Sequence, residues 1–277
     1  MFVFDEVHGM GAPTLVKNLP GKISKFTYRL GLSATPEREY DENGNKFIEQ
    51  EIGETIFVFT LKDAIKRGVL CEFDYNPISF ELSEEDKKEI KRIHAKYAMK
   101  DKQNESYSIE DKWRELATVY KLSKQKLPLF RNMLEENKRL NGDLLENCLI
   151  FVETQEYGLM VQNILFEYCQ EYHTYFAEDQ KKNLNDFAKG KLKCLISCKK
   201  LSEGVDIKSV KNIILFSSDK TKLVTIQRIG RSLRTNPDNP NKRSNVIDFI
   251  CDDSNADKER AEWLSDVSMT RREENDK

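Results

Sequence analysis

The chain has 277 residues, of which 39% are hydrophobic and 33% are charged, and its formal net charge is −2. This composition predicts a folded protein of about two domains and excludes a chain that is disordered throughout. No apolar run approaches the roughly 18 residues of a membrane-spanning helix, and the N-terminus lacks a basic-then-apolar secretion signal. With so small a net charge, any binding to a polyanion must depend on local basic clusters.

The six cysteines show no paired CxxC spacing. This usage is typical of reduced thiols, so we expect a cytoplasmic protein with no membrane association. A zinc site built from Cys194, Cys198 and His173 is conceivable. Cys194 lies in the apolar run 192–197, however, which favours a buried cysteine on a strand.

The N-terminal part of the chain predicts an α/β unit. Apolar strands are expected at 2–4 and near 29–32, and the second leads into the Ser-Ala-Thr-Pro sequence 33–36. Further apolar stretches follow at 56–59, and then with helical spacing at 61–68. Short apolar strands that alternate with helical segments are typical of a parallel sheet.

Between residues 83 and 140 the sequence becomes charged and helical. Two segments begin as capped helices do, with a serine followed three residues later by an aspartate, at Ser83 and at Ser108. Apolar residues then recur at steps of three and four, as expected for helix faces that pack on a neighbour. The polar stretch 100–107 predicts a loop, and Asn141 with Gly142 predicts a turn.

A complete alternation of strands and helices follows. Strands are expected at 148–152, 172–176, 192–197, 212–216 and 245–250, and helices at 156–169, 179–189 and 222–233. Short crossovers between successive strands favour a parallel arrangement. The chain then ends in one more helix and a charged tail.

Two acidic residues follow the first strand, in the sequence Asp5-Glu6-Val7-His8. A carboxylate at a strand end can hold Mg²⁺, and its neighbour can orient and deprotonate an attacking water. Taken alone, the pair is explained as well by an ordinary polar strand end.

Arginines recur at every third position of the predicted helix 222–233 and just beyond it, as Arg228, Arg231 and Arg234. This spacing places three guanidinium groups on a common side of a helix. Arginine suits phosphoryl transfer because its planar fork donates two hydrogen bonds and stays charged. A solvated basic helix explains the arginines alone equally well.

The order of these segments resembles the superfamily 2 helicases and translocases. The matches are Asp5–His8 to motif II, Ser33–Thr35 to motif III, Leu149–Thr154 to motif IV, Leu201–Ile207 to motif V and Gln227–Arg234 to motif VI. Pro237, Lys242 and residues 246–249 resemble the ending of the branch that contains type III restriction subunits and the nucleotide excision repair helicase. Leu233 stands where DEAD-box RNA helicases have glycine.

The resemblance implies an α/β fold with RecA-like parallel sheets, one partial and one complete, joined by a helical segment. The expected parts are a first RecA-like unit at 1–80, a helical linker at 81–143, a second RecA-like unit at 144–255, and a helix with a charged tail at 256–277. It also implies ATP and Mg²⁺ as cofactors and double-stranded DNA as partner.

The resemblance assigns roles to single residues. Asp5 would bind Mg²⁺ and Glu6 would be the catalytic base. Coupling of the nucleotide site would involve His8, Ser33, Thr35 and Gln227. The nucleotide cleft would include Gly204, Asp206 and Arg228. The arginine fingers would be Arg231 and Arg234. Thr154 and Ser197 match positions that touch the nucleic-acid backbone. We add Lys199 and Lys200 to the expected nucleic-acid-binding residues because they are positively charged.

The phosphate-binding loop GxxxxGK[ST] of this family is missing from the 277 residues. The only Gly-Lys pairs, at 21–22 and 190–191, lack both the upstream glycine and the following Ser or Thr. We therefore expect the C-terminal portion of a helicase, with negligible ATP hydrolysis by itself. The alternatives are a non-catalytic DNA- or partner-binding module, which could supply arginine fingers to a separate chain that carries the loop, and a remnant kept only as a folded domain.

Overall fold

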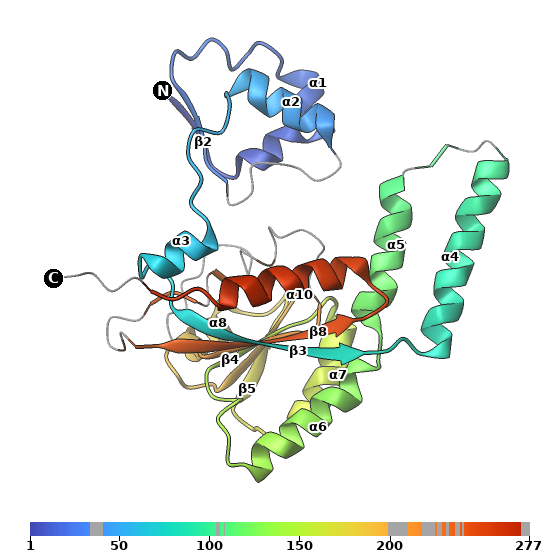
Figure 1. The fold of residues 1–277 in the computed structure, drawn as a ribbon, viewed down its shortest axis with the longest axis vertical. Coiled ribbons are helices and arrows are strands. Elements are labelled where there is room, and N and C mark those ends of the chain that lie inside the picture. The colour runs from blue at the N-terminus through green and yellow to red at the C-terminus, as the bar shows by residue number, and fades with distance from the viewer. Residues whose placement is uncertain are drawn as a thin grey trace.

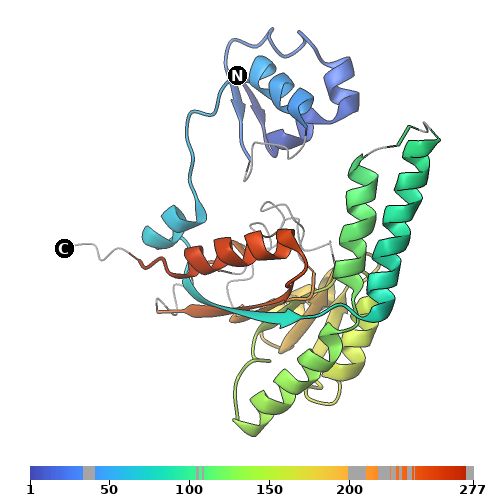
Figure 2. The same ribbon diagram turned by 45° about the vertical axis from the view of Figure 1, so that its right-hand side comes forward.

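A computed structural model describes residues 1–33, 41–103, 106–107, 109–198, 210–217, 225, 229–230, 233–235, 239 and 241–272. Within these residues the chain forms two sheets, of two and of six strands. Each sheet belongs to a separate unit, and Figures 1 and 2 show the units joined by the segment 53–60. No helix in the described ranges is both long and apolar enough to cross a membrane.

The smaller, N-terminal unit is built on a parallel pair of short strands. Strand β1 (Phe2–Phe4) pairs with β2 (Arg29–Gly31), which confirms the strands expected at these positions. The 3-10 helix η1 (Val7–Gly11) and the helices α1 (Pro13–Asn18) and α2 (Glu42–Glu51) complete the unit. Its core is an apolar cluster that consists of Val7, Met10, Ile23, Phe47 and Ile48.

The larger unit contains a six-stranded sheet. Its strands are β3 (Glu72–Phe80), β4 (Cys148–Phe151), β5 (Tyr172–Tyr175), β6 (Cys194–Ser197), β7 (Asn212–Leu215) and β8 (Arg243–Cys251). They lie in the order β3-β8-β7-β4-β6-β5, and every neighbouring pair is parallel. The parallel α/β architecture expected from the alternation is therefore confirmed.

Helices cover both faces of this sheet, because successive residues of each strand point to opposite faces. Leu149 and Phe151 of β4 belong to a core shared with α3 (Leu61–Lys66), α8 (Lys181–Ala188) and α10 (Asn255–Ser268). Cys148 and Ile150 belong to the core on the other face, shared with α6 (Lys126–Arg139) and α7 (Gln155–Leu165). The unit is thus a three-layer α/β/α sandwich (Figure 1).

Strand β3 is the main difference from the sequence analysis, which placed residues 54–80 with the first unit and expected no strand at 72–80. In the structure β3 is an edge strand of the second sheet and pairs with β8 along its whole length. The apolar segment 56–59 forms no strand and is largely exposed. The boundary between the two domains stays a proposal, and this sheet argues for a join before Glu72.

Helices α4 (Glu84–Lys102) and α5 (Ile109–Leu122) form a hairpin that stands away from the sheet layers (Figures 1 and 2). The cap expected at Ser83 is confirmed, since its side chain accepts from the Asp86 N–H and the Asp86 carboxylate accepts in return. Ser108 lies outside the described residues. The loop expected at 100–107 was wrong in part, because α4 continues through Lys102 and buries Tyr97 against α5.

A buried ion pair links β8 to α10. Arg260 donates to both carboxylate oxygens of Asp248, at 2.9 and 3.2 Å, and to Asp257 at 2.7 Å. Tyr75 on β3 adds a hydroxyl donor to Asp248 at 3.0 Å. The Asp248 side chain is fully buried. A charge taken out of water in this way is tolerated only while its partners remain.

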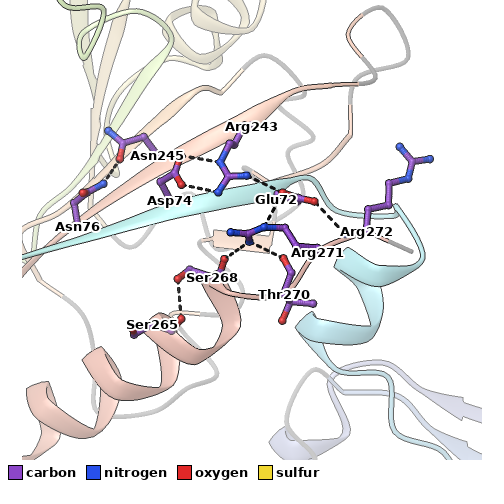
Figure 3. Close-up of polar contacts among 10 residues, drawn as sticks. All are labelled: Glu72, Asp74, Asn76, Arg243, Asn245, Ser265, Ser268, Thr270, Arg271 and Arg272. Carbon is purple, nitrogen blue, oxygen red and sulfur yellow. Dashed lines mark hydrogen bonds and ion pairs between the residues drawn. The ribbon is translucent and has the colours of Figure 1, made fainter. Parts of the chain in front are cut away.

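We predict that Arg260→Ala lowers the free energy of unfolding by about 3–5 kcal/mol, because the Asp248 carboxylate would stay buried without its cation. The matched control is Arg243→Ala. Arg243 makes an equally bidentate contact with Asp74, but at the protein surface (Figure 3). An exposed pair contributes about 1 kcal/mol or less. Equal losses in urea unfolding of the two variants would contradict this account.

Candidate functional site

The acidic pair lies directly beyond the carboxyl end of β1. Asp5 and Glu6 are both exposed. Glu6 has φ 52° and ψ 51°, a left-handed conformation that costs a non-glycine residue about 1–2 kcal/mol. Its N–H donates to Asp5 Oδ1 at 3.0 Å. The turn therefore presents two exposed carboxylates at the start of η1, at an energetic cost that is common in functional sites.

His8 joins the ends of both strands of the first sheet. Its Nδ1 lies 3.0 Å from Ser33 Oγ and 3.4 Å from Glu6 Oε2. The carboxyl ends of parallel strands lie at the same edge of a sheet, so the residues after β1 and β2 are close together. The expected contact between His8 and Ser33 is present, while its coupling role stays a prediction. Thr35 lies outside the described residues.

The donor set suits a magnesium–nucleotide group. Mg²⁺ prefers oxygen ligands and usually takes only one or two carboxylates, with waters and phosphate oxygens filling the other positions. Asp5 offers an exposed carboxylate of this kind. The Glu6 carboxylate follows in the same exposed turn, with its Oε2 atom 3.4 Å from His8 Nδ1.

Arg234 is held against the segment between α3 and β3. Leu70 and Arg234 form an isolated antiparallel bridge, and the Cys71 N–H donates to the Leu233 carbonyl at 2.7 Å. Ile229 and Leu233 are buried in the core beside α3, whereas Arg234 is exposed. The backbone of this arginine is thus fixed to residues between α3 and β3 of the larger unit. Five other expected nucleotide-site residues lie outside the described residues: Gly204, Asp206, Gln227, Arg228 and Arg231.

The expected nucleic-acid contacts differ in accessibility. Thr154 is half-buried and caps α7, with its hydroxyl accepting from the Tyr157 N–H at 3.1 Å. Ser197 is completely buried, and its hydroxyl donates to the Tyr175 carbonyl at 3.2 Å. The structure therefore leaves Thr154 at the surface and places Ser197 inside. Lys199 and Lys200 lie outside the described residues.

A buried cation that the sequence analysis missed lies beneath this edge. Lys126 is 2% exposed, and its ammonium donates to the carbonyls of Phe216 at 2.6 Å and Lys121 at 2.9 Å. The rings of Phe80 and Tyr157 lie 5.1 and 5.7 Å from the nitrogen. No sequence signal marks it, because a lysine at the start of a helix is normally solvated.

The same region anchors the α4–α5 hairpin. Lys121, at the end of α5, forms a mostly buried ion pair with Glu153 at 3.5 Å. Tyr157 donates its hydroxyl to the Ser123 carbonyl at 2.9 Å, and Ser123 donates to Asp86 at 2.7 Å. Side chains on both sides of Thr154 therefore tie the hairpin to the sheet.

The cysteines follow the expected pattern in part. Cys194 is buried on β6, as the apolar run predicted, and its thiol donates to the Leu145 carbonyl at 3.2 Å. His173 is exposed and lies 2.8 Å from the Asn183 side chain. The described residues contain no group of three or more His, Cys, Asp or Glu arranged to hold a metal ion.

The chain is similar to known helicase proteins. Residues 126–236 match the family described as the helicase conserved C-terminal domain. The DNA 3'-5' translocase XPB2 of Sulfurisphaera tokodaii is 21% identical over 257 residues, which cover 84% of this chain and 55% of the relative. The chain thus contains, at residues 126–236, a segment similar to the helicase conserved C-terminal domain. It spans about half the length of the curated relative that it matches.

Solved structures of other proteins share this fold. Dbp5 of S. cerevisiae, bound to RNA and ADP BeF3, has a TM-score of 0.53 at 14% identity and covers 97% of this chain and 57% of its own. The Hef helicase domain of Pyrococcus furiosus has a TM-score of 0.51 at 15% identity and covers 95% and 73%. A fragment of a putative HsdR subunit of a type I restriction enzyme from Vibrio vulnificus has a TM-score of 0.53 at 19% identity and covers 80% and 39%. These neighbours confirm the RecA-like fold class.

The burial of Lys126 predicts a pH-dependent stability for the larger unit. Burial lowers the pKa of Lys126 to about 7, against about 10.4 in an unfolded chain. Between these values the unfolded chain binds more protons, so the contribution of Lys126 to stability is lowest below pH 7 and improves as the pH rises. We therefore compare the free energies of unfolding of wild type and Lys126→Met in urea from about pH 7 to pH 9. We predict that their difference changes in favour of wild type by up to about 1.4 kcal/mol for each pH unit.

The control for this experiment is Lys124→Met, which removes an exposed lysine two residues away. Its difference from wild type should not change with pH. A difference between wild type and Lys126→Met that is equally flat would show that the carbonyls and rings keep the ammonium protonated, and would contradict the prediction.

Proposed function

We propose that this chain acts within an ATP-dependent DNA helicase or translocase of superfamily 2, from the branch of the type III restriction subunits and the excision repair helicase. The observation that carries the proposal is the pairing of two chemistries. An acidic turn with His8 lies in the first unit, and Arg234 is fixed to the segment between α3 and β3 in the second. Phosphoryl transfer needs both kinds of group.

In this proposal each side chain has a defined task. Asp5 would hold Mg²⁺, which when bound neutralises charge on the phosphate oxygens. Glu6 orients a water molecule and accepts its proton, and His8 transmits the state of this turn to Ser33 at the end of β2. Arg234 donates to the charge that develops on the transferred phosphoryl group.

The link to movement lies in the segment between α3 and β3. The backbone contacts from Leu70 and Cys71 to Leu233 and Arg234 tie the arginine to this segment, which follows α3 directly. Closure of the two units would therefore move Arg234 and α3 as one body toward the acidic turn. Thr154, at the carboxyl edge of the second sheet, would contact the DNA backbone. Backbone contacts of this kind favour tracking with little base specificity.

The phosphate cradle of such a site would come from a polypeptide segment outside these 277 residues, either in a longer form of the protein or in a partner. The sequence of the chain contains no GxxxxGK[ST] loop. The carboxylates and the arginine described above would then form one half of a shared site.

We predict that the purified chain binds a 30-base-pair DNA duplex with strong salt dependence but hydrolyses ATP no faster than its Glu6→Gln variant, with or without DNA. Binding is measured by fluorescence anisotropy and hydrolysis by phosphate release. Binding needs only the backbone-contacting surface, whereas turnover needs the phosphate cradle.

Two results would contradict this proposal in different ways. The absence of DNA binding at low salt would remove DNA as the partner. DNA-stimulated hydrolysis that is lost in Glu6→Gln would show that the chain completes its own phosphate site, and only the shared-site part of the proposal would fall.

If the chain is purified together with a polypeptide that carries the loop, the complex should show DNA-stimulated ATPase activity. We predict that Arg234→Ala lowers this activity by roughly 10³-fold or more, as removal of an arginine finger does. Lys124→Met serves as the control and should leave the activity unchanged. A complex that is indifferent to Arg234→Ala would contradict the role given to this arginine.

A further inference from the structure

Residues 269–272, here called the strap, follow α10 and lie beside the segment between α3 and β3 (Figure 3). The strap contacts both carboxylate oxygens of Glu72, the first residue of β3. Arg272 donates its backbone N–H to Oε1 at 3.1 Å, and Nε of Arg271 lies 3.6 Å from Oε2. Arg271 also donates to the carbonyl of Ser268, the last residue of α10, at 2.7 Å. A charged stretch near a chain end is commonly held by little, so these contacts mark the strap as tied down.

Gly68, just after α3, allows the strap to approach the backbone closely. It has φ +66°, and a Cβ at this position would lie 2.6 Å from Nε of Arg272 and 2.8 Å from its Cζ. The guanidinium of Arg272 therefore packs directly against the Gly68 backbone, and any side chain there would displace it. Near the start of α3, Lys62 pairs with Asp266 of α10 at 2.6 Å. The C-terminal part of the chain thus holds α3 near both of its ends.

Glu72 also connects the strap to the larger sheet. Its Oε2 accepts from Nη1 of Arg243 on β8 at 2.7 Å (Figure 3). Asp74, two residues further along β3, accepts from the same guanidinium with both carboxylate oxygens. Two neighbouring carboxylates therefore share Arg243. Of these two, Glu72 is the one that is hydrogen-bonded to the described strap residues.

The segment that the strap contacts is the one that fixes Arg234. The Cys71 N–H donates to the Leu233 carbonyl at 2.7 Å, and Leu70 forms the isolated bridge with Arg234. Such a short pairing outside a sheet is marginally stable by itself, so its geometry depends on what holds the residues around it. The residues that flank it on one side are the two that the strap contacts.

We propose that the strap is a positioning device for Arg234. By holding Gly68 and Glu72, residues 269–272 fix the backbone between them, and through it the arginine that donates to the phosphoryl group in the proposed function. The inference rests on the proposed function in one respect, the task of Arg234. Release of the strap would loosen this arginine without unfolding the larger unit, because none of the four described strap residues belongs to its apolar cores.

The first test compares Glu72→Ala with Asp74→Ala in the full chain by hydrogen–deuterium exchange. Both changes remove one carboxylate partner of Arg243, but only Glu72→Ala releases the strap. We expect amide exchange at 69–71 and 233–235 to become roughly fivefold faster or more in Glu72→Ala, because few contacts limit the local opening of this segment. Asp74→Ala should stay within about twofold of wild type. Equal exchange in the two variants would show that Glu72 acts through Arg243 alone, and would overturn the proposal.

A pair of truncations tests the strap without altering β3. One chain ends at Met269, which keeps the C-cap of α10, and the control chain ends at Arg272. The shorter chain should show the same faster exchange at 69–71 and 233–235, whereas the control should exchange as wild type does. Exchange in β4 and β6 should stay unchanged in both. Faster exchange spread evenly over these strands would show a general loss of stability in place of a loss of positioning, and would overturn the proposal.

Activity separates this inference from the proposed function. In a complex with a polypeptide that carries the phosphate loop, the chain that ends at Met269 should have a kcat for ATP hydrolysis lower by roughly tenfold or more, with the KM unchanged, because an arginine finger acts in the transition state. The chain that ends at Arg272 should keep the wild-type kcat. A complex that loses activity in Arg234→Ala but not in the shorter chain would overturn the role of the strap alone. A complex indifferent to Arg234→Ala would overturn the task of that arginine, and the inference would fall with it.

Discussion

The pairing of β3 with β8 is the contact on which the rest of the structure depends. It runs in parallel from Glu72 opposite Arg243 to Phe80 opposite Cys251. The linker and α3 lead into one end of this ladder, and the α4–α5 hairpin leaves from the other. The same ladder therefore positions both the backbone bridge to Arg234 and the root of the hairpin. Helix α10 also packs on this ladder, through the buried Arg260–Asp248 pair.

Most of the helicase fold could be predicted from the chain alone, and β3 shows why the remainder could not. Buried parallel strands such as β4 and β7 are continuous apolar runs, which are recognisable in any window of sequence. β3 is an edge strand that contains Asn76 and Pro77, and such residues normally argue against a strand. Only its partner, more than 160 residues later in the sequence, stabilises it, and local patterns contain no information about such a distant pairing.

The candidate site shows the same division. Order along a parallel sheet indicates which strand ends converge, and on this basis the proximity of His8 and Ser33 was foreseeable. It does not indicate which side chain at a strand end faces solvent. Ser197 therefore resembled an accessible contact, although it is buried and bonded to the neighbouring strand. Lys126 was missed for the converse reason, since only the folded chain supplies the carbonyls of Phe216 and Lys121.

The proposal that the carboxyl edge of the second sheet is the DNA-binding face of this chain is tested most directly by hydrogen–deuterium exchange with and without duplex DNA. The account predicts slower amide exchange at 152–158 when DNA is bound, with no change at 181–189. Protection confined to 181–189, or DNA binding that leaves 152–158 unchanged, would contradict it.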